Sequence, residues 1–198
     1  IFVSSIDHGA SPPSVLTART VASTGADLND AVAAGVLAIS RLHGGAIEEG
    51  QRLYLAIAAR MGAKGLDEEG AAREVLDEMK AKGKRASGFG HRLHTKDPRT
   101  DRLFALAAEA GLAGRHVSIA RTVEMVLAVQ LGKPLPINVD GAIAALLCDL
   151  GIPPEIGNAF FIMARVPGLV AHVHEEKTRM KPMRKVDPED FAYDGPAE

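Results

Sequence analysis

Three histidines and one aspartate of this chain lie beside or near glycine, at the expected junctions of loops and helices. They are His8, His43, His91 and Asp140. Histidine and carboxylate side chains are the usual groups for moving protons near neutral pH, and neighbouring glycines let the backbone approach a ligand closely. The pattern therefore indicates proton-transfer chemistry on a small molecule.

His43 precedes Gly44 and Gly45 and a segment with helical periodicity. The positive end of a helix dipole keeps an imidazole at a helix N-terminus neutral, so that the ring can donate a hydrogen bond to a developing enolate. A helix cap or a turn histidine is the alternative, and for a single histidine it is the more common role.

The segment around His91 combines glycine with positive charge. Between Lys80 and Arg99 the only acid is Asp97, while lysine and arginine recur throughout. Such a loop could hold phosphates through backbone N–H groups and cationic side chains. A solvated basic loop is the alternative. A nucleotide-binding glycine-rich loop is a poor match, because no Gly-Lys-Ser or Gly-Lys-Thr follows.

Two charged residues stand in apolar surroundings. Asp140 closely follows Pro136 and Asn138 and opens an apolar helix. A helix N-cap at Asn138 or Asp140 is the alternative to a site there. Arg165 lies in an apolar stretch that includes Met163 and needs an anionic partner if it is buried. Its alternative is a position at the helix edge, with the charged end in water.

Metal binding and disulfide formation find no support in the sequence. His172 and His174 are two residues apart and cannot share one face of a helix. No other spacing of histidine, cysteine, aspartate and glutamate resembles a metal site. Cys148 is the one cysteine, so the chain cannot form an internal disulfide. We expect an intracellular, cytoplasmic protein with no metal and no tightly bound cofactor.

Helical periodicity predicts the elements that must position these residues. Apolar residues recur with helical spacing in almost every segment, and no convincing strand alternation occurs. The predicted helices span 27–40, 46–61, 67–81, 100–110, 116–131, 139–150 and 155–176, the last bent near Pro167. Aromatic residues make up only 4% of the chain, so small aliphatic side chains must fill the core. We predict an all-α fold, with a charged, extended arm from Lys177 onward.

Composition argues against two classes of partner. The formal net charge is -2, which disfavours broad nucleic-acid binding. No apolar run was found that reaches the ~20 residues of a membrane span, so we expect no membrane partner.

The order of the motifs resembles the citrate synthase family. The diagnostic pieces are Gly88-Phe89-Gly90-His91 followed by Asp97-Pro98-Arg99, and Asn138-Val139-Asp140; Leu42-His43-Gly44-Gly45 precedes them and Ala164-Arg165 follows them. The resemblance extends from His8 to about Pro182. It implies a two-domain helical fold, with 46–142 as a small domain for coenzyme A and catalysis, and 1–45 with 143–198 as a discontinuous large domain.

The resemblance also implies roles for single residues. His43 looks like the histidine that stabilises the enol of acetyl-CoA. Asp140 looks like the base for its methyl proton, and His91 like the group that polarises the ketone of oxaloacetate. Substrate carboxylates would bind His8, Arg99, Arg165 and Lys181, and coenzyme A would bind Gly88, Phe89, Gly90 and Asn138. Members of the family form homodimers in which the C-terminal arm of one subunit donates a basic residue to the partner's site.

Two departures from the family pattern concern contacts to the dicarboxylate. Pro12 replaces an asparagine that usually follows the first histidine, and Lys181 replaces arginine in an Arg-Pro pair near the C-terminus. Lysine cannot grip a carboxylate with the two-pronged fork of arginine. The Asp7-His8-Gly9 pattern and the arm at 176–179 look closer to citryl-CoA lyases and to the lyase part of ATP-citrate lyase.

The first functional hypothesis is therefore cleavage of citryl-CoA to acetyl-CoA and oxaloacetate, with a coenzyme A thioester as substrate. The alternative is a citrate or 2-methylcitrate synthase. A subunit that binds acyl-CoA without catalysis is disfavoured by the intact set of His43, His91 and Asp140. A nucleic-acid binder that uses the basic loop is disfavoured by the overall charge.

Overall fold

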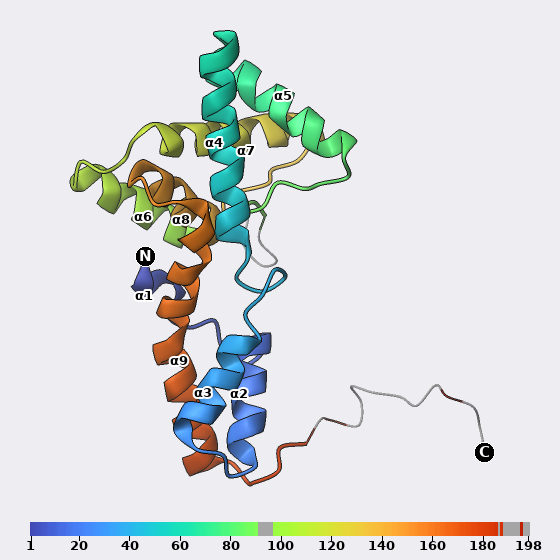
Figure 1. Ribbon diagram of the computed structural model, residues 1–198, viewed down its shortest axis with the longest axis vertical. Coiled ribbons are helices and arrows are strands. Elements are labelled where there is room, and N and C mark those ends of the chain that lie inside the picture. Colours follow the sequence, from blue (N-terminus) through green and yellow to red (C-terminus); the bar gives the residue numbers. More distant parts are fainter. Residues whose placement is uncertain (91–96, 186, 188–194, 196–198) are drawn as a thin grey trace. The chain divides into compact units, whose positions relative to one another are not determined.

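The computed structural model describes residues 1–90, 97–185, 187 and 195. His91 lies outside these residues, so its role stays a prediction. The elements are α1 (Phe2–Ser5), α2 (Pro13–Ser23), α3 (Leu28–Leu37), α4 (Ala46–Lys64), α5 (Glu68–Ala81), α6 (Pro98–Glu109), α7 (Arg115–Leu131), α8 (Val139–Asp149), a 3-10 turn η1 (Pro154–Ile156) and α9 (Gly157–Arg179). Besides these helices, the described part of the chain contains turns and loops with isolated β-bridges, and no β-strand (Figure 1). The predicted all-α fold is confirmed.

The chain divides into two compact units. One consists of Ile1–Asp7 and Ile39–Arg165, and the other of His8–Ala38 and Val166–Glu198. These boundaries differ from the predicted ones after residues 45 and 142, because α8 packs on α4 and α7 and so joins the segment after 142 to the helices before it. The assignment of a large and a small domain stays a prediction.

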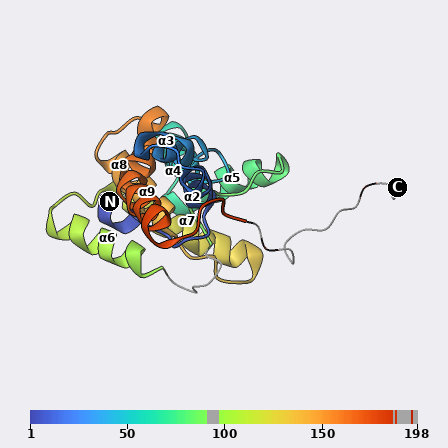
Figure 2. The ribbon, with the colours of Figure 1, turned by 90° about the horizontal axis from the view of Figure 1, so that it is seen from below.

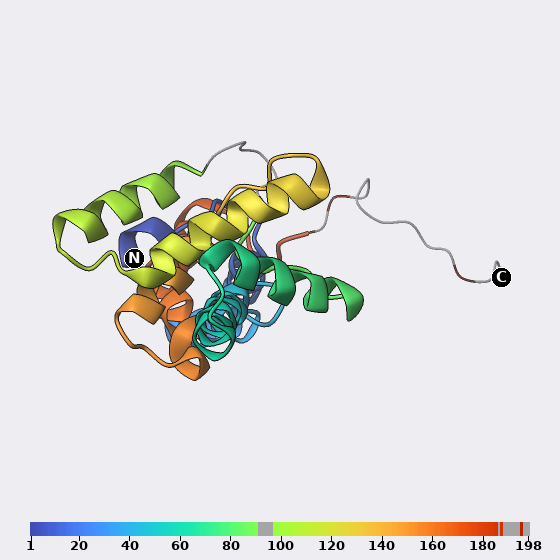
Figure 3. The same ribbon diagram turned by 90° about the horizontal axis from the view of Figure 1, so that it is seen from above.

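The first unit is built around α4. Figure 3 shows α5 (green) and α7 (yellow) lying beside α4 (teal), and α8 also packs on α4 and α7. Small residues permit close approach of these helices: a Cβ on Gly50 of α4 would lie 2.9 Å from the Cβ of Ala144 on α8. Because α8 is buried along most of its length, it forms a fixed support for Asp140 at its start.

Asp149 joins the other end of α8 to α7. Its carboxylate accepts hydrogen bonds from the backbone N–H groups of Gly114 (2.8 Å), His116 (2.9 Å) and Val117 (3.2 Å). The Nδ1 atom of His116 lies 2.8 Å from the same carboxylate. Asp149 therefore supplies the N-terminal cap of α7 from another helix, a role that the sequence did not reveal.

The second unit packs α2 and α3 against the C-terminal part of α9 (Figure 2). Its buried apolar residues are Val15, Ala18, Ala22, Ala31, Leu169 and Val173. Glu176 is buried beside them and accepts hydrogen bonds from Arg19 (2.8 Å) and from Nη2 of Arg184 (2.7 Å). The arm that follows α9 is thereby tied to the helices of this unit.

The segment Pro154–Arg179 is, within the described ranges, the one helical stretch long and apolar enough to cross a membrane. We did not expect such a stretch from the sequence. Its apolar residues Phe161 and Leu169 are buried in the chain's own cores, and it also buries the charged residues Arg165 and Glu176. Buried charge and internal packing are typical of a core helix rather than of a lipid-facing one.

Candidate functional site

His43 is held in a tight turn directly before α4. The backbone N–H of Ser40 donates to the carbonyl of His43 (2.9 Å), and the N–H of His43 donates to the carbonyl of Ser40 (2.8 Å). Gly44 has a φ of 90°, and a Cβ there would lie 2.5 Å from the Phe161 ring. Only glycine fits this position. The half-buried His43 ring meets Phe161 edge to face, with the centroids 5.7 Å apart.

The loop at 88–90 is fixed to the segment that leads into α8. Gly90 donates its N–H to the carbonyl of Pro136 (2.7 Å), and Asn138 donates its N–H to the carbonyl of Gly88 (3.0 Å). The Nδ2 of Asn138 donates to the carbonyl of Gly90 (3.0 Å). Phe89 meets the buried Tyr54 edge to face. The predicted coenzyme A residues Gly88, Phe89, Gly90 and Asn138 thus form one hydrogen-bonded unit.

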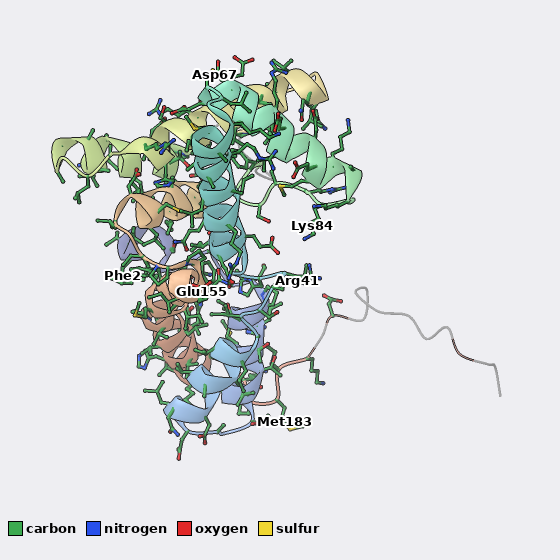
Figure 4. All side chains as sticks on the ribbon, turned by 45° about the horizontal axis from the view of Figure 1, so that its top comes forward. Phe2, Arg41, Asp67, Lys84, Glu155 and Met183 are labelled. Carbon is green, nitrogen blue, oxygen red and sulfur yellow. The ribbon has the colours of Figure 1, made fainter. Side chains whose placement is uncertain are left out.

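The basic segment before this loop is open to solvent. Lys80, Lys82, Lys84 and Arg85 are all exposed. Figure 4 shows Lys84 on the loop that follows α5. Ser87 donates its hydroxyl to the carboxylate of Glu49 on α4. Exposed cationic side chains are compatible with both sequence-based interpretations, a phosphate-binding loop and a solvated basic loop, so binding of phosphate groups stays a prediction.

Asp140 stands in the first turn of α8. The Oδ1 of Asn138 caps this helix by accepting from the N–H groups of Asp140 (3.0 Å) and Gly141 (3.2 Å). Asn138 is thus the cap, which leaves the carboxylate of Asp140 unused for capping. Its Oδ1 atom is buried and has no hydrogen-bond partner among the residues that the structure describes. A buried oxygen without a partner is costly unless a ligand supplies one.

Arg165 is held from two sides. It is 3% exposed, its Nε donates to the carbonyl of Ser5 (3.1 Å), and its guanidinium carbon lies 4.7 Å from the centroid of the Phe161 ring. Its Nη1 atom is buried without a hydrogen-bond partner in the described part of the chain. A buried, oriented arginine with a spare donor is suited to bind a carboxylate.

Arg99 is oriented by Asp97 and by α1. The Nε (2.9 Å) and Nη2 (2.8 Å) atoms of Arg99 donate to the two carboxylate oxygens of Asp97. Nη1 donates a long bond of 3.5 Å to the carbonyl of Ser4. Successive carbonyls of α1, at Ser4 and Ser5, therefore contact the two arginines. Phe2 anchors α1 by stacking on Phe160, with the centroids 5.9 Å apart.

Electrostatics couple the charged groups of this site. Burial raises the pKa of Asp140 above its ordinary value, although the positive charges of Arg99 and Arg165 oppose this shift. Burial lowers the pKa of Arg165, while the charges of Asp7 and Asp140 act in the opposite direction. Burial alone would raise the pKa of Asp97, but the hydrogen bonds from Arg99 outweigh it and bring the pKa below its ordinary value. The pKa of Asp140 is thus set by burial, which raises it, against the two arginines, which lower it.

The first unit therefore contains His43, Asp140, Arg99 and Arg165, together with the loop at 88–90. His8 and Lys181 belong to the second unit, where both are exposed, and their assigned roles stay predictions.

No group of three or more potential metal ligands occurs among the residues that were described. Ser5, Phe161 and Asp97 had no role predicted from the sequence. Two signals were present: Phe161 is four residues before Arg165, and Asp97-Pro98 is typical of a helix start.

Residues 1–185 match a family model described as citrate synthase, C-terminal domain. The solved structure of citryl-CoA lyase from Hydrogenobacter thermophilus is 43% identical with a TM-score of 0.88, and the match covers 100% of this chain and 75% of that chain. An ATP citrate lyase mutant of Methanosaeta concilii, solved in complex with (3S)-citryl-CoA, is 26% identical with a TM-score of 0.80, over 100% of this chain and 33% of that chain.

A curated relative, putative citrate synthase 2 of Mycobacterium tuberculosis (strain ATCC 25618 / H37Rv), is 34% identical over 193 residues. That match covers 92% of this chain and 48% of the relative. The chain spans about a third to a half of the length of the curated relatives that it matches.

Proposed function

Because the chain belongs to the citrate synthase family, we propose that it cleaves citryl-CoA to acetyl-CoA and oxaloacetate. The observation that carries this proposal is Asp140, a buried carboxyl group with a raised pKa, in the same unit as two oriented arginines; one of its oxygens has no hydrogen-bond partner among the described residues. The 43% identity to a citryl-CoA lyase supports the same reaction. The known complex of an ATP citrate lyase with (3S)-citryl-CoA supports the choice of substrate.

The proposed step breaks the bond between the carbinol carbon and the CH2 carbon next to the thioester. His91, or a water that it holds, takes the proton of the tertiary alcohol, and the alcohol carbon becomes the ketone of oxaloacetate. The bonding electrons pass to the thioester, which becomes an enolate. His43, at the start of α4, donates a hydrogen bond to the enolate oxygen. Asp140 then delivers its proton to the CH2 carbon, which gives acetyl-CoA.

The raised pKa of Asp140 suits this direction, because an acid must hold its proton until the enolate forms. Arg99 and Arg165 would bind the carboxylates that remain on the oxaloacetate half. The glycine loop at 88–90 and Asn138 would line the coenzyme A site. The basic residues of the exposed segment would meet its phosphates. No tightly bound cofactor takes part in the proposed chemistry.

Two residues favour cleavage over synthesis. Pro12 is buried as the N-cap of α2, so no amide side chain is available at that position to bind oxaloacetate. Lys181 stands where an arginine is usual. A synthase must capture free oxaloacetate with strong carboxylate ligands, whereas a lyase receives its dicarboxylate tethered to coenzyme A. A lyase can therefore function with weaker contacts to the carboxylates of its substrate.

We further propose a cytoplasmic homodimer with sites completed across the interface by the C-terminal arm. Support comes from the start of the arm. The N–H groups of Met183 and Arg184 donate to the carbonyl (2.8 Å) and hydroxyl (3.1 Å) of Ser23. This leaves Lys181 exposed. A fixed arm with an exposed lysine could reach a partner's substrate at little cost in conformational entropy.

Steady-state kinetics in both directions test the proposal. We expect efficient cleavage of citryl-CoA, slow condensation of acetyl-CoA with oxaloacetate, and a high KM for oxaloacetate. Asp140→Asn should lack activity in either direction. Rapid formation of citrate at low oxaloacetate concentration would favour the citrate or 2-methylcitrate synthase alternative instead.

A further inference from the structure

Asp97 uses both carboxylate oxygens to join two helices. Its Oδ1 accepts hydrogen bonds from the backbone N–H (3.0 Å) and the Nε (2.9 Å) of Arg99. Its Oδ2 accepts from the Nη2 of Arg99 (2.8 Å) and from the backbone N–H of Val139 (3.1 Å). Asp97 is only 1% exposed. One buried carboxylate therefore links the N-terminus of α6 to the first turn of α8.

We propose that Asp97 is a positioning residue for the proposed reaction: it aims Arg99 at a substrate carboxylate and keeps the charge of Arg99 from pairing with Asp140. The identity of the substrate carboxylate rests on the proposed function. The contacts of Asp97 do not depend on it.

The shape of the guanidinium group explains how Asp97 orients Arg99. Arginine has two edges that can each hold a carboxylate through a pair of N–H donors. Asp97 occupies the edge formed by Nε and Nη2. The edge formed by Nη1 and Nη2 retains the remaining donors, and its one hydrogen bond within the described part of the chain is the 3.5 Å bond from Nη1 to Ser4. Asp97 thus fixes the plane of Arg99 and leaves one edge for a second carboxylate.

The charge of Asp97 also affects Asp140. Among the residues that the structure describes, the charged groups that act on Asp140 are Arg99 on α6, Arg165 on α9, and Asp97 at the cap of α6. The two arginines favour the ionised form of Asp140, and Asp97 disfavours it. Asp97 also pairs with Arg99 at 2.8 Å, which reduces the attraction that Arg99 exerts on Asp140. Removal of the Asp97 charge should therefore favour ionisation of Asp140 for both reasons.

The backbone provides a third connection between these groups. Val139, which donates its N–H to Asp97, directly precedes Asp140 in α8. The hydroxyl of Thr100 on α6 donates to the carbonyl of Ile137 (3.0 Å), just before the α8 cap. The start of α6 and the start of α8 are thus bonded at two points, so that Arg99 and Asp140 are held on a common support.

The test measures the protonation of Asp140 directly. Carboxyl-13C aspartate is incorporated into the whole chain, and the Asp140 signal is assigned by its loss in Asp140→Asn. In Asp97→Asn we expect the titration midpoint of Asp140 to fall by about one pH unit. We also expect citrate to bind about tenfold more weakly by calorimetry, because Arg99 is no longer held. An unchanged midpoint in folded Asp97→Asn would overturn the proposal.

Two further variants separate the possible causes. Asp97→Glu keeps the charge but changes the geometry, so citrate binding should weaken while the Asp140 midpoint stays close to that of the original protein. This variant also decides the positioning role if Asp97→Asn fails to fold, since unchanged citrate affinity would then contradict it. Asp67→Asn is the matched control, because Asp67 caps α5 through the N–H of Gly70 (2.8 Å) on an exposed surface. It should change neither the midpoint nor the citrate affinity.

The same measurements distinguish this inference from the proposed function. If the original protein did not cleave citryl-CoA, but Asp97→Asn still lowered the Asp140 midpoint, the reaction assignment would be wrong and the positioning role would hold. If the original protein cleaved citryl-CoA but Asp97→Asn left the titration midpoint of Asp140 unchanged, the proposed reaction would hold and the positioning role would be wrong.

Discussion

Gly88 and Gly141 touch through their backbones. A Cβ on Gly141 would lie 2.2 Å from the carbonyl oxygen of Gly88, and a Cβ on Gly88 would lie 2.6 Å from the Cα of Gly141. The same Gly88 carbonyl accepts the N–H of Asn138 (3.0 Å), and the Gly141 carbonyl accepts the hydroxyl of Tyr54 (3.3 Å). The loop at 88–90 is therefore held against the helix turn that carries Asp140.

This contact predicts the effect of a single methyl group. Gly141→Ala should force the loop away from α8, which lowers the free energy of unfolding by about 1–3 kcal/mol and strongly reduces turnover. Urea unfolding and steady-state assays measure the two effects. Gly62→Ala is the control, since Gly62 lies within α4 and a Cβ there meets nothing within 4 Å. In this control the free energy of unfolding should increase by about 0.5–1 kcal/mol, and the activity should stay the same. Normal activity in Gly141→Ala would refute the importance of this contact.

The raised pKa of Asp140 predicts how stability depends on pH. Below the ordinary aspartate pKa of 3.8, Asp140 is protonated in both the folded and the unfolded chain. As the pH rises above that value, the unfolded chain releases this proton while the folded chain retains it. The free energy of unfolding, relative to Asp140→Asn, should therefore decrease with rising pH until the folded pKa is passed, with a slope of at most about 1.4 kcal/mol per pH unit.

Urea unfolding of the original protein and of Asp140→Asn at matched pH values measures this difference. The amide variant removes the titrating group and keeps nearly the same shape. The contributions of the other carboxylates to the free energy of unfolding are then the same in both proteins and cancel in the difference. A difference that stayed constant or increased with pH would show that burial does not dominate at Asp140.

The positions of most helices could be predicted from the sequence, because their apolar residues recur regularly. The two exceptions have physical reasons. α1 has four residues, too few for a periodic pattern. The buried face of α2 includes Ser14 and Arg19, which interrupt its apolar pattern. The charge of the buried Arg19 is neutralised by an ion pair with Glu176.

The place of a candidate residue in the fold was predictable where its neighbours in sequence carry the signal, as for His43, which precedes two glycines and α4; its role stays a prediction. It was not predictable where a contact joins distant segments. The carbonyl of Ser5 meets Arg165 across 160 positions of the chain, and no local pattern encodes that pairing. The pKa of Asp140 is also a property of the folded chain, because burial causes it.

His43 should be required for turnover but not for binding coenzyme A. Its predicted partner is the enolate oxygen, so His43→Ala should lower turnover by about 10²–10⁴-fold and leave the calorimetric affinity for coenzyme A largely unchanged. His116→Ala is a suitable control. His116 pairs with Asp149 at the cap of α7 and should affect stability rather than turnover. If His43→Ala lost affinity for coenzyme A and turnover to the same extent, His43 would be a coenzyme A-binding residue rather than a catalytic one.

The proposed arm predicts a dimer with shared sites. Light scattering should show a homodimer, and Lys181→Ala should raise the KM for citryl-CoA. Lys177→Ala provides a comparison, since Lys177 is also exposed but belongs to the last turns of α9. An active monomer would rule out the dimer. Unaltered kinetics in Lys181→Ala would rule out the proposal that Lys181 of the arm contributes to the partner's site.

The products formed from citryl-CoA test the central claim most directly. The purified protein is incubated with citryl-CoA, and the coenzyme A species and organic acids are separated and quantified by mass spectrometry. We predict equal amounts of acetyl-CoA and oxaloacetate, formed by the original protein and not by Asp140→Asn. Free coenzyme A and citrate as the main products would contradict the proposed cleavage, because they would show hydrolysis of the thioester rather than cleavage of the carbon–carbon bond.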